Sequence, residues 1–213
     1  MYGEENFNIA GTYNGIEVLY YSMVLNDKAL HYIYKALKIC LAKAKNSINL
    51  STIYNNIGIT LENMGDYEKA LQYYKKSRDL AKEKMGKNHH KVRTPSINMT
   101  AIYIEQEEYE KALELLQKVL STDINNLGEK HPNVTTNYMR FGDIYLAKKQ
   151  HKKASDYYLK ALSMGQSVFG NDHKAIAYIY EQLGILNREV KKFDTAMFYF
   201  DKALAINKKI YPE

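Results

Sequence analysis

The feature that most constrains this chain is a repeat of 42 residues that runs through nearly its whole length. Alanines mark the repeat in a recurring local context, four of them 42 residues apart and one 41 residues earlier: Ala29, Ala70, Ala112, Ala154 and Ala196. A second series keeps the same spacing: Gly58, Thr100, Gly142 and Gly184. Repeats of this length indicate stacked structural units, each of which buries its apolar face against its neighbours.

Residues 51–80 have the pattern of two amphipathic helices joined by a tight turn at Gly65. Apolar and small residues recur at three- and four-residue steps in both halves, which places them on one face of each helix. Gly58 and Ala70 allow two helices to approach closely, and Tyr74 fills the space beside them. We therefore expect each repeat to be a helical hairpin without strands.

Residues 51–80 resemble a tetratricopeptide (TPR) repeat, with an aromatic at position 4, an apolar residue and Gly at 7 and 8, Gly-Asp-Tyr at 15–17, Ala at 20 and an aromatic at 24. The connector at 127–136, LGEKHPNVTT, narrows the resemblance to kinesin-light-chain-like TPRs, whose connector reads Leu-Gly-x-x-His-Pro-x-Val-Ala-Thr. This resemblance covers residues 2–213. It implies an all-α fold, a right-handed alpha-alpha superhelix (TPR solenoid) of five helical hairpins and ten helices.

Stacked hairpins share one continuous core, so we expect a single repeat domain over residues 1–213. The expected repeats are 8–45, 50–85, 93–126, 133–168 and 174–209. First helices are expected near 8–23, 50–63, 94–106, 133–148 and 174–189, and second helices near 27–45, 67–85, 109–126, 151–168 and 193–209. Both ends of the sequence match the connectors, which predicts a segment of a longer array or a short member of a family built that way.

Three local features refine these boundaries. Connector glycines such as Gly128 follow long helices and are expected to end them in the left-handed αL conformation. The connector at Ala44 and Lys45 lacks this glycine, which predicts a continuous or differently bent segment there. Pro95 predicts that its helix begins at Thr94 as the N-cap.

Composition excludes several classes of protein. The net charge is +6, but only four of the 30 basic residues are Arg, and no strip joins Arg to aromatics, so nucleic-acid binding is not expected. Cys40 is the only cysteine, which excludes an intrachain disulfide and favours a buried, inert thiol. The chain has no leader pattern at its start and no apolar run near the ~20 residues of a membrane span. We therefore expect a cytoplasmic protein without membrane insertion.

Candidate chemistry is sparse. His89, His131 and His173 recur at the repeat spacing, but zinc ligands lie about 2 Å from one ion and single helices already sit about 8–10 Å apart. These histidines are expected to pack or cap within each connector and not to bind metal. No phosphate loop, H-E-x-x-H or nucleophile elbow is present. We expect no enzyme activity and no cofactor.

The resemblance assigns the concave groove of the superhelix to positions 2, 5, 9 and 12 of the first helices. Asn14 and Asn55, both at position 5, match the Asn with which light-chain-like TPRs hold a peptide backbone. Many of the other inward residues are apolar, which favours a groove for a peptide of a partner protein. The predicted peptide-binding residues are Asn14, Val18, Tyr21, Asn55, Ile59, Glu62, Ile97, Ile104, Met139, Asp143, Leu146, Glu181, Ile185 and Arg188.

Two alternatives remain at this point. The inward residues of a tightly wound groove can cover one another, or neighbouring repeats of a longer array can fill it, and the chain is then a structural spacer without a dedicated ligand. The last helix also carries an unusual number of large apolar residues, which predicts self-association through uncapped terminal repeats: Phe193, Met197, Phe198, Tyr199, Phe200 and Leu204.

Overall fold

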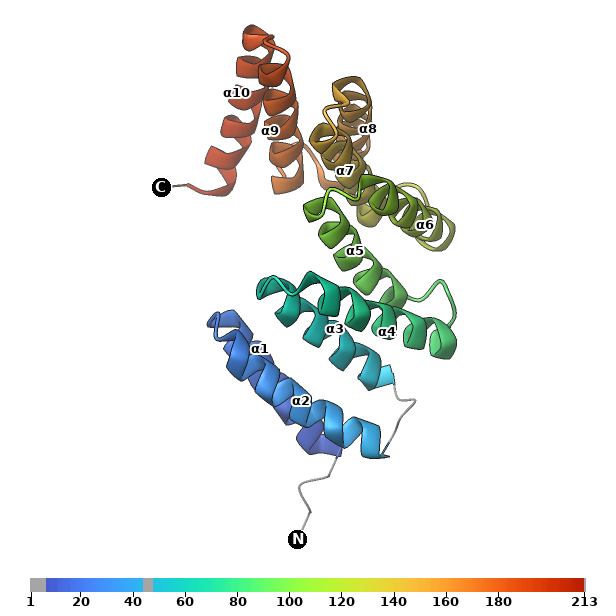
Figure 1. Cartoon of the computed structure of the whole chain (residues 1–213). Coiled ribbons are helices and arrows are strands. Elements are labelled where there is room, and N and C mark those ends of the chain that lie inside the picture. Colours follow the sequence, from blue (N-terminus) through green and yellow to red (C-terminus); the bar gives the residue numbers. More distant parts are fainter. Residues whose placement is uncertain (1–6, 44–47, 213) are drawn as a thin grey trace. The chain divides into compact units, whose positions relative to one another are not determined.

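The computed structural model describes residues 7–43 and 48–212 of the chain. Within these residues the regular secondary structure is entirely α-helical, as expected, and Figure 1 labels the helices in chain order. They are α1 (Phe7–Ser22), α2 (Asn26–Lys43), α3 (Ile48–Asn63), α4 (Tyr67–Met85), α5 (His90–Glu105), α6 (Tyr109–Leu127), α7 (Pro132–Ala147), α8 (His151–Phe169), α9 (Lys174–Glu189) and α10 (Phe193–Ile210).

The helices belong to two compact units. Unit 1 is Met1–Gln106 and holds α1 to α5, and unit 2 is Glu107–Glu213 and holds α6 to α10. In unit 1, α1 pairs with α2 and α3 with α4, while α3 also packs against α2 and α5 packs on α3 and α4 (Figure 1). In unit 2, α7 pairs with α8 and α9 with α10, while α6 packs on α7 and α8 on α9. The expectation of one domain over residues 1–213 stays a prediction.

Glycine at position 8 brings the two helices of a hairpin into close contact. A Cβ atom on Gly58 would lie 2.5 Å from Cε1 of Tyr74, so the predicted close approach is confirmed. The same contact recurs between Gly142 and Tyr158 and between Gly184 and Phe200, at 2.4 Å and 2.7 Å. In the first hairpin Ile33 stands where Tyr74 stands in the second, and Glu17 replaces the glycine.

The connector glycines have positive φ but are not in the αL conformation that we expected. Gly86, Gly128 and Gly170 have φ of 83°, 82° and 81° with ψ of 160°, 160° and 174°. This region of backbone space is essentially restricted to glycine. Each glycine still closes its helix, because its N–H donates to the carbonyl four residues earlier. The counterparts at Gly3 and at Ala44–Lys45 lie outside the described residues.

The recurring histidines cap the first helices of three hairpins. Nδ1 of His89 accepts a hydrogen bond from the Lys91 amide at 3.2 Å. His131 and His173 do the same with the amides two residues on, both at 3.1 Å. The side chain satisfies one of the amides that a helix start leaves unpaired. The capping role expected for these residues is confirmed.

One predicted helix start is wrong. Helix α5 begins at His90 and not at Thr94, and Pro95 lies inside it and is buried. Proline removes the single bond that its nitrogen would have donated to the Lys91 carbonyl one turn earlier. The cap at His89 and the packing of α5 on α4 outweigh that loss, so the helix keeps the same start as its counterparts.

Candidate functional site

The first helices of unit 1 carry a ladder of asparagine side chains that includes both residues predicted to hold a peptide. Nδ2 of Asn56 donates to Oδ1 of Asn14 at 3.0 Å, and Nδ2 of Asn98 donates to Oδ1 of Asn55 at 3.3 Å. The first pair joins α1 to α3, and the second joins α3 to α5. Since the oxygens of Asn14 and Asn55 accept these bonds, their Nδ2 groups are the ends that can meet a ligand. The position-6 partners, Asn56 and Asn98, were not predicted.

A buried carboxylate lies beside the first of these pairs. Glu17 is only 2% exposed, and it accepts from Nδ2 of Asn56 at 3.3 Å and from the Thr60 hydroxyl at 3.3 Å. Burial raises the pKa of Glu17, and the bonds from Thr60 and Asn56 oppose that rise. The signal that could have identified Glu17 is its place at position 8, where three other repeats have glycine.

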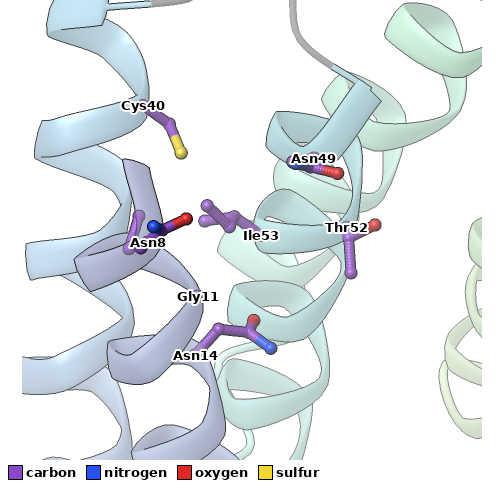
Figure 2. A pocket seen from close by; sticks show the side chains of 8 residues that line it. Asn8, Gly11, Asn14, Cys40, Asn49, Thr52 and Ile53 are labelled. Carbon is purple, nitrogen blue, oxygen red and sulfur yellow. The ribbon is translucent and has the colours of Figure 1, made fainter. Parts of the chain in front are cut away.

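A pocket of about 410 Å³ opens between α1, α2 and α3 beside Asn14 (Figure 2). Amide, hydroxyl, thiol and apolar groups line it together: Asn8, Ala10, Gly11, Asn14, Cys40, Asn49, Thr52 and Ile53. Figure 2 shows Ile53 and the Cys40 sulfur turned toward the space between the helices, while Asn14 reaches toward α3 from α1. Gly11 and Thr52 occupy position 2 of their repeats, which the resemblance also assigns to the groove.

Cys40 is buried, as expected, with 1% of its surface exposed. Burial raises the pKa of its thiol, so the sulfur stays protonated and unreactive at neutral pH. The pocket therefore offers hydrogen-bonding and apolar contacts and no nucleophile.

The other predicted residues of unit 1 have mixed surroundings. Val18 is 49% exposed, and Tyr21, Ile59 and Ile104 are half-buried. Ile97 is only 8% exposed, because α5 packs against α3 and α4, so the prediction that it lines an open groove is wrong. Glu62 accepts a hydrogen bond from the Tyr74 hydroxyl, and burial raises its pKa.

Unit 2 has a separate polar site around Asp143. Oδ1 of Asp143 accepts from the Tyr158 hydroxyl at 2.7 Å and from the Tyr178 hydroxyl at 2.9 Å, which joins α7 to both α8 and α9. Burial raises the pKa of Asp143, while the two tyrosines and the nearby Arg140 charge oppose the rise. A pocket of about 350 Å³ lies here, and its lining is Asp143, Leu146, Ala147, Lys149, Tyr178, Gln182 and Glu189.

The structure brings Asp143 and Leu146 to this second pocket and leaves the other predicted residues of unit 2 outside its lining. Met139 and Ile185 are half-buried, and Arg188 is exposed. Glu181 accepts a hydrogen bond from Nδ2 of Asn207 at 3.0 Å, which ties α9 to α10. In the described part of the chain no group of three His, Cys, Asp or Glu side chains could hold a metal ion. No helix there is long and apolar enough to cross a bilayer.

Sequence comparison identifies the repeat. A family model described as Tetratricopeptide repeat matches residues 8–83, 49–125, 92–166 and 133–209, which together span nearly the whole chain. No curated protein matches the sequence.

Comparison with solved structures supports the same fold. BtubC (BKLC) from P. vanneervenii superposes with a TM-score of 0.83 at 19% identity, over 97% of this chain and 84% of that protein. A putative kinesin light chain from Podosopora anserina, described as having nearly identical TPR-like repeats, superposes with a TM-score of 0.80 at 12% identity, over 98% and 99%.

A third relative was solved with a peptide. The Rap conjugation gene regulator of plasmid pLS20, in complex with the Phr* peptide, superposes with a TM-score of 0.71 at 14% identity, over 96% of this chain and 54% of that protein. At these identities the likeness concerns the fold alone. The repeat match and the all-helical hairpins together show that this chain belongs to the tetratricopeptide-repeat family and has the fold of kinesin-light-chain-like repeat proteins.

Proposed function

We propose that this chain is a scaffold that binds an extended segment of a partner protein on the first-helix face of unit 1, with one side chain of that segment in the pocket beside Asn14. The observation that carries the proposal is that this pocket is lined by Asn14 on α1 and by Thr52 and Ile53 on α3, the helix that also carries Asn55. Tetratricopeptide repeats are in general non-catalytic scaffolds for protein interactions, and the pLS20 Rap regulator was solved with a peptide.

Gly11 gives independent support. Of the ten described glycines, four have positive φ and four would place a Cβ within 3.0 Å of a neighbouring side chain. The two exceptions are Gly11 and Gly15, which have nothing within 4 Å and lie inside helix α1. Glycine inside a helix costs about 1 kcal/mol relative to alanine, so the internal packing of the chain gives no reason for it. A ligand that approaches the α1 backbone closely at the pocket supplies one for Gly11.

The ligand chemistry follows from which atoms are already bonded. Asn56 and Asn98 orient the Asn14 and Asn55 amides by occupying their oxygens, so the Nδ2 groups donate to backbone carbonyls of the partner. Ile53 and half-buried Ile59 favour an apolar side chain in the segment. Burial of one or two such side chains contributes roughly 3–6 kcal/mol before entropic costs, which corresponds to micromolar affinity at best. We place the protein in the cytoplasm, with a protein partner and not a nucleic acid.

A random-peptide library captured on the immobilised chain tests the proposal, with affinities of the enriched peptides then measured by fluorescence polarisation. Gly11→Leu adds a side chain at the pocket, where a Cβ atom would meet nothing within 4 Å, and should weaken binding by about tenfold or more, or about 1.4 kcal/mol. Gly15→Leu is the matched control, because it adds the same side chain to the same helix away from the pocket lining.

A second pair of variants separates the amide donor from the rest of the site. Asn55→Asp keeps an oxygen for Asn98 and removes the Nδ2 donor, whereas Asn125→Asp adds the same charge to an exposed position on α6. Only the first change should weaken the peptides. Equal retention of the same peptides by Gly11→Leu and Asn55→Asp would contradict the proposal and favour a structural spacer.

A further inference from the structure

Helix α10 has an exposed apolar face. The corresponding faces of α4 and α8 are covered by the helix that follows each of them. Phe193, Met197 and Leu204 stand at steps of four and seven, which places them on one side of the helix, and they are 64%, 62% and 52% exposed. The equivalent residues of α4 and α8 are half-buried where the next helix packs on them: Tyr67, Leu71 and Arg78 in α4, and His151, Ser155 and Leu162 in α8.

Helix α1 also has an uncovered face, and the corresponding faces of the other first helices are buried. Leu19 is 63% exposed, while its equivalents Thr60, Ile102, Ile144 and Leu186 are at most 5% exposed. Thr12 is exposed, while its equivalents Ile53, Pro95, Asn137 and Ile179 are buried. The α1 sequence contains one charged residue, Glu17, and that residue is buried, so the exposed face is uncharged.

We propose that the α10 face of one copy of this chain packs on the α1 face of a second copy, and so continues between molecules the hairpin packing seen inside each unit. The proposal commits to a second copy because the two faces are the two halves of one contact. Within the units, the helices equivalent to α10 and α1 pack on one another, α4 on α5 and α8 on α9.

Two contacts show how the faces correspond. Nη1 of Arg78 on α4 lies 3.9 Å from Sδ of Met99 on α5, and the equivalents of this pair are Leu204 and Ile16. Nε2 of His151 on α8 lies 2.8 Å from Oε2 of Glu189 on α9, and the equivalents are Phe193 and Ser22. At both places the intermolecular contact replaces polar groups by apolar or neutral ones, so it leaves no charge buried without a partner.

Gly15 fits the same contact. Its equivalent Asn56 meets position 5 of the preceding first helix, through the bond to Asn14. A second copy would bring Glu181 to that position, and the absence of a side chain at Gly15 gives the larger carboxylate room. This accounts for the second glycine that packing inside the chain leaves unexplained.

A contact between two different faces is not completed by a dimer, because each partner keeps one face unused. Each added copy leaves one α10 face and one α1 face exposed, so association continues into linear oligomers as the concentration rises. Pairing of two α10 faces would instead stop at a dimer. The net charge of +6 on each copy opposes association, and added salt should strengthen it by screening that repulsion.

Sedimentation velocity and light scattering on the full chain test the proposal, with Leu19→Glu and Met197→Glu as face variants. Both side chains are more than half exposed, so each variant should fold, and circular dichroism checks that it keeps its helix content. The wild type should exceed the mass of a dimer at high concentration, and each variant alone should be a monomer. An equimolar mixture should form a 1:1 dimer and stop there, because each partner retains one intact and different face.

Leu159→Glu is the matched control, because Leu159 is 43% exposed on α8 and is not equivalent to any residue of either face. It should associate as the wild type does. A wild type that stays monomeric at every concentration, a Leu19→Glu variant that still dimerises alone, or a mixture of the two face variants that stays monomeric would each overturn the proposal. A monomer would leave both faces to another protein or to further repeats.

Discussion

Glu17 is a carboxylic acid held between α1 and α3 by two neutral donors, Asn56 and Thr60. Because burial raises its pKa, the folded state binds the proton more tightly than the unfolded chain does. Its stabilising contribution is complete below the ordinary pKa of about 4.5 and is lost as the pH rises through the raised value. The slope is at most about 1.4 kcal/mol per pH unit for a single group.

Glu17→Gln should remove this component, so its free energy of unfolding should fall less with rising pH than that of the wild type. Urea unfolding at a series of pH values measures the difference. Glu68→Gln serves as the control, since it removes the same carboxyl group from an exposed position on α4. Identical profiles for wild type and Glu17→Gln would show that the carboxyl titrates alike in both states.

The residue scale is also where prediction from sequence is weakest. Position in the repeat places Asn14 and Asn55 on the same face, but the bonding of their oxygens depends on how closely successive hairpins pack. Asn56 and Asn98 therefore emerge only from the structure. Ile97 illustrates the same limit, because an inward position is exposed only if the next helix leaves it so.

At the scale of the helix, the cap at His89 depends on protonation. The imidazole accepts through Nδ1, and burial with the nearby His90 and Lys91 charges lowers its pKa. The neutral form is therefore favoured in the folded state, and the stabilisation is present above the ordinary pKa of about 6.5 and is lost as the pH falls through the lowered value. A protonated ring also places a cation at a helix N-terminus, which is unfavourable.

His89→Asp supplies a cap that stays an acceptor at mildly acidic pH. The variant should lose less thermal stability than the wild type between neutral and mildly acidic pH, as measured by circular dichroism melts. His31→Asp is the comparison, because His31 is exposed in the middle of α2 and caps nothing. If the wild-type melting temperature falls with pH no more steeply than that of His89→Asp, then protonation of the His89 cap does not cause the loss of stability.

Helix types and most boundaries are predictable here because each is specified several times over. Periodicity, turn residues and caps agree within each repeat, and the repeats agree with one another. The start of α5 was wrong because the rule that proline ends helices was applied at one site without the cap at His89. The αL assignment of Gly128 was wrong because glycine tolerates positive φ over a wide range of ψ, so its presence does not specify the αL conformation.

At the scale of the whole chain, the 42-residue spacing predicts the family and fold that the comparisons show. The same spacing does not predict where the pockets lie, because pockets arise where the repeats differ from one another. The pocket beside Asn14 lies where Gly11 leaves α1 without a side chain, and the second lies where Asp143 accepts hydrogen bonds from two tyrosine hydroxyls.

The two glycines of α1 have a consequence for motion. Each costs about 1 kcal/mol of helix stability, and neither is packed against a neighbouring side chain. Its amides should therefore exchange with deuterium faster than those of α3, a helix of the same 16 residues whose glycine is packed against Tyr74. Local opening of α1 is then the fluctuation that a bound segment suppresses.

Mass spectrometry of deuterium uptake would detect that suppression in peptides that cover Gly11. A ligand of the pocket should slow exchange in α1 far more than in α9, where no contact with it is expected. Exchange in α1 as slow as in α3, or unchanged by a ligand that binds the wild type, would contradict the prediction that α1 opens locally and that binding suppresses this opening. The glycines make α1 a built-in reporter of occupancy, which allows candidate partners to be screened without a label and before any of them has been identified.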